Sequence, residues 1–292
     1  MTHTQAIQLQ LAELKIAIHS DYQFEIPDAL APFCEPPQIA PTDATVRITN
    51  ELFPNLQADH KIFEANFEMY STAPLWQTYQ QAPHLIVRAA AYETRKFPVS
   101  DLWYETNQHT HYTLGTNNQE SSILKPFHNP IDSLLYTHIL HNHNALMIHA
   151  SCVEAHGKGY LFAGFSGVGK STMAKLWEQQ GATIINDDRI LLRKHKDQIW
   201  AYNSPMPYPT QPRKTKLSGI FLLEQAPQNE ALRLTGITAK AHTAAFCIQH
   251  NFSKHFTTKT YQIITDLFAQ IPIFILSVYP DKNIVEFVKK LI

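Results

Sequence analysis

Alternation of hydrophobic and polar positions predicts short β-strands in the first part of the chain. Residues 14–18 alternate with a period of two, residues 45–48 are β-branched, and residues 84–89 form a short apolar run. Two further runs, at residues 103–105 and 111–114, are spaced to pair as a hairpin. Six prolines before residue 55 interrupt the region and keep its strands short. The pattern indicates a β-rich region that carries no catalytic motif.

Strands and helices both occur in the rest of the chain. A polar segment ending in Pro126 and Pro130 marks the boundary, and helical periodicity follows at residues 131–140. Two strand-like runs, 145–154 and 160–163, form a second predicted hairpin. Further strands are predicted at residues 183–185, 190–192, 199–202, 219–224 and 273–278, and further helices at 171–180, 238–249, 261–269 and 283–291. The sequence therefore predicts an α/β domain over residues 126–292. A β-rich accessory domain over residues 1–125 would present substrate or mediate homo-oligomerisation.

Composition narrows the class of protein. A chain of 292 residues that is 44% hydrophobic has enough apolar sequence for one large domain or two smaller ones. No window approaches the roughly 20 apolar residues that a membrane span needs, and the first ten residues are too polar for a secretory signal. The three cysteines show no metal or redox spacing. We expect a protein of the reducing cytoplasm that does not bind membranes.

Charge is distributed unevenly along the chain. Residues 1–145 carry 7 Lys and Arg against 15 Asp and Glu, a net of −8, whereas residues 146–292 carry 17 against 10, a net of +7. A basic half attracts nucleotides and acidic partners, although solvated surface charge explains the asymmetry equally well. No aromatic residues are interleaved with the basic ones, so we do not expect nucleic-acid binding.

A nucleotide phosphate-binding loop is the clearest motif. The stretch Gly-Phe-Ser-Gly-Val-Gly-Lys-Ser-Thr at residues 164–172 matches G-x-x-x-x-G-K-[ST] and lies between a predicted strand and a predicted helix. Its glycines let backbone N–H groups turn towards a phosphate, and the following helix N-terminus favours negative charge. The sequence therefore predicts a site for ATP or a related nucleotide with Mg²⁺. Its predicted binding residues are Gly164, Ser166, Gly167, Val168, Gly169, Lys170, Ser171 and Thr172.

Two roles within this loop follow from its chemistry. Lys170 is expected to reach the β- and γ-phosphates, and the Ser171 hydroxyl is expected to ligate Mg²⁺. A carboxylate pair, Asp187 and Asp188, then ends the next predicted strand. Carboxylates beside a phosphate loop suit Mg²⁺ coordination and a base for a hydroxyl nucleophile, whereas the alternative is an ordinary polar turn.

Residues 203–216 are predicted to form a loop. They contain four prolines and end in a basic cluster that includes Arg213 and Lys214. A loop of this kind can close over nucleotide and acceptor, and its two cations are candidates for contact with the substrate or the phosphate. A rigid connection with solvated charges is the alternative. The histidines show no spacing that predicts a structural metal site.

The region from His149 to Arg189 resembles the catalytic domain of HPr kinase/phosphorylase. The matching segments are residues 147–151, the phosphate loop and residues 184–189, with looser matches at residues 221–225 and in the last strand and helix. The sequence is most similar to the stand-alone HPr-kinase-like proteins found beside peptide-modification genes, which include lasso-peptide precursor kinases. The resemblance implies a phosphoenolpyruvate-carboxykinase-like mixed sheet and ATP- and Mg²⁺-dependent phosphorylation of a serine hydroxyl.

The resemblance also implies roles for particular residues. Asp187 is expected to act as the base and Asp188 to lie nearer the metal, while His149 lies against the phosphate or the base. The family's Arg-Gly-x-Gly-Ile-Asn signature is replaced here by Asn-Ser-Pro-Met-Pro at residues 203–207. We therefore expect a peptide or small-protein acceptor and do not carry over HPr or the reverse phosphorylase reaction. A small-molecule kinase and a nucleotide-binding switch without phosphoryl transfer remain as alternatives.

Overall fold

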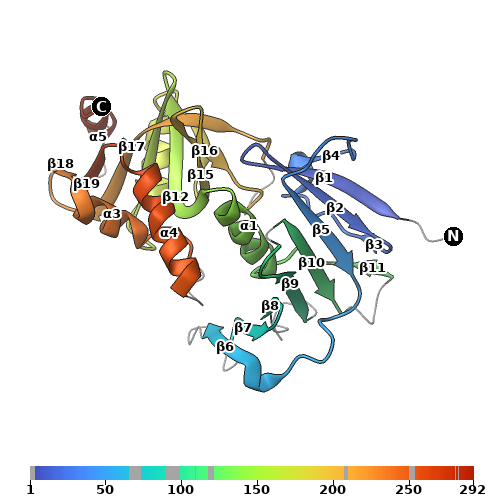
Figure 1. Cartoon of the computed structure of the whole chain (residues 1–292). Helices are drawn as coiled ribbons and strands as arrows, with labels where there is room; N and C mark the ends of the chain where they lie inside the picture. Colours follow the sequence, from blue (N-terminus) through green and yellow to red (C-terminus); the bar gives the residue numbers. More distant parts are fainter. Residues whose placement is uncertain are drawn as a thin grey trace. The chain divides into compact units, whose positions relative to one another are not determined.

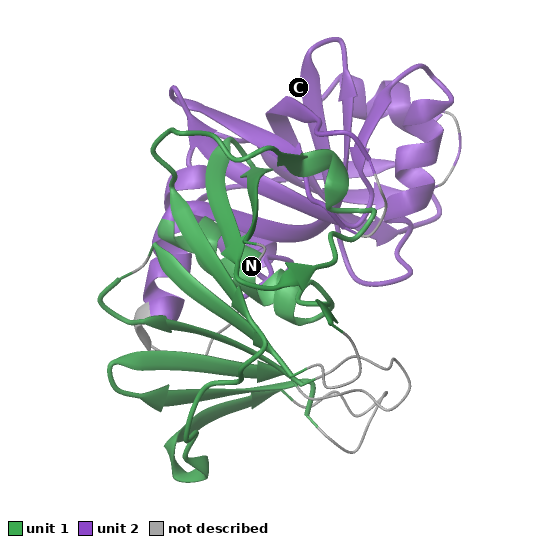
Figure 2. Cartoon of the chain, turned by 90° about the vertical axis from the view of Figure 1, so that its right-hand side faces the viewer, with its two compact units in different colours: residues 1–142 green, residues 143–292 purple. Residues whose placement is uncertain are grey.

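A computed structural model gives the structure of the chain, which divides into two compact units, residues 1–142 and 143–292 (Figure 2). The described residues are 4–65, 74–89, 99–108, 110–117, 122–206, 210–249, 254–279, 281 and 283–292. The protein combines two large sheets with five α-helices in the described part of the chain, so the expected α/β class is confirmed (Figure 1). None of the described helices has the length and apolar character that a membrane crossing requires.

A nine-stranded mixed sheet, in the order β4-β1-β2-β5-β10-β9-β8-β7-β6, forms the first unit. Strand β5 is parallel to β2 and to β10, and the other neighbours are antiparallel. The strands are β1 (Gln5–Leu11), β2 (Leu14–Ser20), β4 (Cys34–Glu35), β5 (Ala44–Thr49), β6 (Lys61–Ala65), β7 (Trp76–Gln81), β8 (His84–Ala89), β9 (Ser100–Glu105) and β10 (His111–Thr116). A separate pair comprises β3 (Gln23–Phe24) and β11 (Ile123–Leu124), and two 3-10 turns are η1 (Ala31–Phe33) and η2 (Ala58–His60).

All five strands predicted in this region are present, and β9 and β10 pair antiparallel as expected. Strand β1 was not predicted because its glutamines make the segment polar overall, yet Leu9 and Leu11 are fully buried. Helix α1 (Ile131–Asn142) belongs to the first unit, although we expected the boundary to precede it. Tertiary contacts explain the difference, because Tyr104 of β9 contacts the ring of His138 and Asn142 donates a hydrogen bond to the Tyr112 hydroxyl.

The second unit is built on an eight-stranded sheet. Its main order is β13-β12-β15-β16-β17-β19-β18, with β14 also on β12, and β13 additionally pairs parallel with β17. The strands are β12 (Ala145–Ala155), β13 (Lys158–Ala163), β14 (Thr183–Asn186), β15 (Arg189–His195), β16 (Gln198–Asn203), β17 (Lys214–Gln225), β18 (Glu230–Leu234) and β19 (Ile273–Val278). The helices are α2 (Lys170–Glu178), α3 (Gly236–Ala244), α4 (Lys254–Leu267) and α5 (Asn283–Lys289).

Two apolar clusters lie on opposite faces of β13 and β17. Leu161 and Ile220 belong to one cluster together with apolar residues of α3 and α4, whereas Phe162 and Phe221 belong to the other with residues of α2 and α5. Successive side chains of a strand point to opposite faces, so both faces of these strands are buried. This packing fixes the ends of the strands that carry the phosphate loop.

Three predictions in this unit were wrong in extent. The helix expected over residues 261–269 is α4, which begins at Lys254 and ends at Leu267. The helix expected over residues 238–249 ends at Ala244. The backbone of Cys247 then forms an isolated antiparallel β-bridge with Ile148, and the Ile248 N–H donates to the Met147 carbonyl. The loop expected over residues 203–216 ends earlier, because Lys214 begins β17 and pairs with Tyr202 of β16. Residues 207–209 of that loop lie outside the described residues.

Candidate functional site

The phosphate loop joins β13 to α2 in a conformation that requires its glycines. A side chain at Gly164 would meet the Val168 side chain at 2.8 Å, and Gly169 has a φ of +114°. Gly169 caps α2 without a side-chain hydrogen bond, so no side chain occupies the N–H groups of the first turn. Exposed N–H groups at a helix N-terminus form an anion site.

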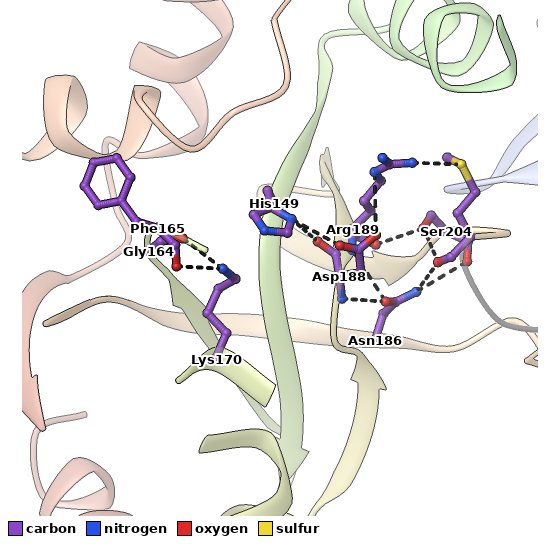
Figure 3. A network of polar contacts seen from close by, with 9 residues as sticks. His149, Gly164, Phe165, Lys170, Asn186, Asp188, Arg189 and Ser204 are labelled. Atoms are coloured by element: carbon purple, nitrogen blue, oxygen red, sulfur yellow. Dashed lines mark hydrogen bonds and ion pairs between the residues drawn. The ribbon is translucent and has the colours of Figure 1, made fainter. Parts of the chain in front are cut away.

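Lys170 bends back over this loop. Its Nζ atom donates to the carbonyl oxygens of Gly164 at 2.9 Å and Phe165 at 3.2 Å (Figure 3). Burial lowers the pKa of Lys170, and the nearby Asp188 carboxylate partly offsets that effect. The backbone carbonyl of Lys170 accepts a hydrogen bond from the buried hydroxyl of Ser151 on β12. The ammonium group is thus held beside the loop, where a phosphate can replace the two carbonyl acceptors.

The carboxylate pair lies between β14 and β15. Both strands are antiparallel to β12, with Cys152 opposite Asn186 and His149 opposite Arg189, so the two carboxylate residues connect strands that pair with the same neighbour. The Asn186 side chain holds this connection in place: its Oδ1 accepts from the Asp188 N–H, and its Nδ2 donates to the Met206 carbonyl. Asn186 therefore fixes the backbone at Asp188.

His149 and Asp188 meet through two polar contacts. The Nδ1 atom of His149 lies 3.0 Å from the Asp188 backbone oxygen and 3.2 Å from Oδ1 of its carboxylate (Figure 3). Both partners are acceptors, which assigns the ring proton to Nδ1 and leaves Nε2 as an acceptor in the neutral ring. The hydrogen bond from His149 lowers the pKa of Asp188, and Arg189 and Lys170 lower it further. Asp188 is therefore held as a carboxylate.

One hollow of about 470 Å³ brings these groups together. We call it the phosphate hollow; it is lined by His149, Ser166, Gly167, Gly169, Lys170, Ser171, Thr172, Asp187 and Asp188. Within the described part of the chain, no hydrogen bond or ion pair engages the Asp187 carboxylate. Gly164 and Val168, also predicted as nucleotide-binding residues, do not line the hollow.

Arg213 and Lys214 do not line the phosphate hollow. The Arg213 guanidinium donates to the Ile184 carbonyl on β14, and the Lys214 ammonium lies 5.0 Å from the centre of the Trp200 ring. A hydrogen bond from the Asn203 side chain to the Thr210 hydroxyl also joins two described residues of the loop that precedes Arg213. Both cations are exposed and already engaged on the strands beside the hollow.

Three residues of the site were not assigned a role from the sequence. Ser151 anchors the start of α2, Asn186 holds the carboxylate pair, and Arg189 lies 3.7 Å from the Asp188 carboxylate. Asn186 and Arg189 flank the carboxylates directly, so proximity in sequence was an available signal. Ser151 had none, because its hydroxyl meets the loop only through strand pairing.

The donor set of the hollow fits Mg²⁺. The Ser171 hydroxyl and the Asp188 carboxylate supply oxygen ligands, and Mg²⁺ is usually held by one or two carboxylates together with substrate phosphates and water. The described residues contain no group of three or more His, Cys, Asp or Glu side chains placed to hold a metal by themselves. A metal here would therefore depend on nucleotide oxygens.

Comparison with known proteins shows similarity to solved structures and not to known sequences. No protein-family model matches the sequence, and no curated protein matches it significantly. Among solved structures, the HPr(Ser) kinase/phosphatase from Coxiella burnetii aligns with 50% of this chain and 97% of its own, at 11% sequence identity and a TM-score of 0.30. A TM-score this low does not establish a shared fold.

Proposed function

We propose that the chain is a kinase that transfers the γ-phosphate of ATP, with Mg²⁺, to a serine hydroxyl of a peptide or small protein in the reducing cytoplasm. One observation carries the proposal: the phosphate loop and two carboxylates line the same hollow. Phosphoryl transfer needs a phosphate cradle, a metal site and a group that accepts the hydroxyl proton. The hollow offers all three, and the resemblance at residues 147–189 favours serine as the acceptor.

The first group of residues binds the nucleotide. The N–H groups of the first turn of α2 and the Lys170 ammonium neutralise the β- and γ-phosphates, whose oxygens replace the carbonyls of Gly164 and Phe165. Ser171 and Asp188 are the residues that would hold Mg²⁺. When bound, Mg²⁺ supplies positive charge to the phosphate oxygens.

Asp187 is the proposed base. Its carboxylate lines the hollow and, within the described part of the chain, has no other partner, so it can accept the proton of the serine hydroxyl. As that O–H bond breaks, the serine oxygen bonds to the γ-phosphorus, and the bond from phosphorus to the bridging oxygen breaks to leave ADP. Asp188 is the poorer base because its lowered pKa disfavours protonation.

His149 acts beside the transferring group in this proposal. Its Nδ1 proton is engaged by Asp188, which fixes the ring and leaves Nε2 to accept a hydrogen bond in the hollow. If His149 rather than Asp187 accepts the serine proton, Asp188 would stabilise the resulting imidazolium. Comparing the two single substitutions separates these roles.

A peptide acceptor is favoured by an aromatic pair at the loop. Phe165 is 77% exposed and stands 5.3 Å from Phe246, ring centre to ring centre. Both residues are tied to the site, because Phe165 accepts a hydrogen bond from Lys170 and the Phe246 carbonyl accepts one from the His149 N–H. An exposed aromatic surface fits an apolar side chain next to the acceptor serine. Arg213 and Lys214 are retained as candidates for contacts with the acceptor outside the hollow.

Two alternative functions differ from the peptide kinase in the product that each would form. A small-molecule kinase on the same scaffold would phosphorylate a free hydroxyl compound, and a nucleotide-binding switch would bind ATP without transfer. The second carboxylate argues against the switch, because nucleotide binding needs only the one beside the metal.

The test is incubation of the protein with γ-labelled ATP, Mg²⁺ and a library of serine peptides that vary in the residues flanking the serine. We expect labelled phosphoserine in the wild type and about 10²- to 10⁴-fold slower labelling in Asp187→Asn. Transfer of the label to a small hydroxyl compound and not to peptides, with release of ADP, would favour the small-molecule kinase. Nucleotide binding without any transfer to peptides, small proteins or small molecules would contradict the proposal and favour the switch.

A further inference from the structure

A second pocket, of about 590 Å³, lies next to the phosphate hollow. We call it the side pocket. It shares Gly167, Gly169 and Thr172 with the hollow, so the phosphate loop separates and borders both spaces. Its other walls come from α2, through Met173 and Leu176, and from the ends of β17 and β19. A ligand with a phosphate tail in the hollow therefore has its remaining part directed to this pocket or to solvent.

The side pocket lies at the carboxyl ends of parallel strands. β13 and β17 are parallel, as are β17 and β19, and Leu223 and Val278 bring the ends of the last two strands into the wall. Ligands of α/β proteins bind outside the carboxyl ends of such strands. The volume also falls within the roughly 300–1,000 Å³ typical of small-molecule sites.

The residues that line the side pocket limit the chemistry of its occupant. Leu176, Leu223 and Val278 give it apolar walls, and none of the lining residues in the described part of the chain is ionisable. A second phosphate or a charged acceptor group would be left without a counter-charge there. A planar, uncharged heterocycle can bury its faces against such walls and leave its polar edge to the few polar groups present.

Gln225 contributes a side-chain amide to the lining of the side pocket. Its Nε2 atom makes one long hydrogen bond, of 3.5 Å, to the Gly167 carbonyl on the loop. A side-chain amide both donates and accepts, and rotation by half a turn exchanges the two. It can therefore pair with a 6-amino purine or with a 6-oxo purine, whereas a carboxylate or an ammonium would favour one of them.

We propose that the side pocket holds the nucleoside of the bound nucleotide and accepts adenine and guanine with similar affinity. This inference rests on the proposed function, because it takes the phosphate hollow to be the site of the triphosphate. Sites built to read one hydrogen-bonding pattern reject the other by about 10⁴- to 10⁵-fold. Among the described lining residues, the side-chain oxygen and nitrogen atoms belong to Thr172 and Gln225, whose hydroxyl and amide can each both donate and accept, so discrimination between the two purines stays small.

The experiment compares nucleotides with a ligand that has no nucleoside. Calorimetry measures binding of ATP, GTP and inorganic tripolyphosphate, each with Mg²⁺, to the wild type and to two variants that fill the pocket from different walls, Leu176→Trp and Ala226→Phe. Leu232→Trp on β18 is the control, because Leu232 is 62% exposed and lines neither space. Circular dichroism checks that each variant is folded.

We expect ATP and GTP affinities within about 10-fold of each other in the wild type, and both higher than that of tripolyphosphate. In each filled variant, the affinity for both nucleotides should fall by about 10-fold or more, and the affinity for tripolyphosphate should change by less than about twofold. Unchanged ATP affinity in the filled variants, or an equal loss for tripolyphosphate, overturns the nucleoside assignment. A difference of more than about 100-fold between the ATP and GTP affinities overturns the proposal that the pocket accepts both purines.

These outcomes are separable from failure of the proposed function. If the protein binds ATP in the side pocket but never phosphorylates a peptide, the nucleoside assignment is supported and the proposed kinase function is contradicted. If the protein phosphorylates peptides and its filled variants bind ATP as the wild type does, the kinase function is supported and the nucleoside assignment is contradicted.

Discussion

The imidazole Nδ1 of His149 lies 3.2 Å from a carboxylate oxygen of Asp188, and it also meets the backbone oxygen of the same residue at 3.0 Å. The two contacts fix the plane of the ring and keep the carboxylate ionised. The pair thus separates the two neighbouring aspartates chemically: Asp188 is engaged, and Asp187 lines the hollow beside it.

Acid should remove the stabilising contribution of Asp188. Because its pKa in the folded protein is lowered from 3.8, the contribution is present above that value and is lost as the pH falls through the folded pKa. The difference in unfolding free energy between wild type and Asp188→Asn should therefore narrow from about pH 6 to about pH 3. Denaturant titrations at both pH values measure it, with Asp197→Asn as the control. A difference that widens on acidification would contradict the assignment.

Replacing the proposed base should affect transfer more than binding. Asp187→Asn keeps the shape of the side chain but cannot accept a proton, so turnover should fall by about 10²- to 10⁴-fold while ATP affinity changes little. Asp188→Asn should instead raise the Mg²⁺ concentration needed for half-maximal activity. His149→Gln tests the other base, since a loss of turnover there with little effect in Asp187→Asn would exchange the two roles.

Removing the loop ammonium should abolish nucleotide binding or weaken it strongly. Lys170→Ala takes away the positive charge nearest to the phosphate cradle, and we expect a loss of about 100-fold or more in affinity or turnover. Lys175→Ala, an exposed lysine on the same helix, is the matched control and should bind as the wild type does. Calorimetry with undiminished affinity in Lys170→Ala would exclude the phosphate hollow as the nucleotide site.

Asn186 should position the carboxylates rather than touch substrate. Asn186→Ala removes the acceptor of the Asp188 N–H and one of the two side-chain donors to the Met206 carbonyl, which keeps its hydrogen bond from the Ser204 hydroxyl. The unsatisfied N–H should cost about 1–3 kcal/mol of stability. The substitution should also lower kcat with little change in KM for ATP, because the loop and Lys170 are untouched. Steady-state kinetics at a temperature where the variant is fully folded measures this, and unchanged kcat would limit Asn186 to a structural role.

The aromatic pair should matter for the acceptor and not for the nucleotide. Phe165→Ser keeps the backbone carbonyl that receives Lys170 but removes the exposed ring, so the KM for a peptide acceptor should rise by about 10-fold. ATP affinity should change by less than about twofold. Leu232→Ser provides an exposed apolar control. An equal KM for peptides in Phe165→Ser and wild type would remove the pair from the acceptor site.

The sequence by itself determined the features that depend on local patterns. Period-two alternation located β2, a β-branched run located β5, an apolar run located β8, and hairpin spacing located β9 and β10. The glycines with Lys170 and Ser171 marked the strand, loop and helix. The carboxylates were found for the same reason, because they directly follow a buried strand. Such features are specified within a few residues of the chain, where spacing and residue type are sufficient.

Tertiary structure decided the contacts between residues that are distant in the sequence. His149 and Asp188 are 39 positions apart and meet because β12 pairs with β15, and Ser151 reaches Lys170 from the same strand. The helix over residues 238–249 ended early for a similar reason, since Ile248 bonds to β12 instead of to its own turn. Strand pairing sets these distances, and a single sequence does not state which strands pair or in what register.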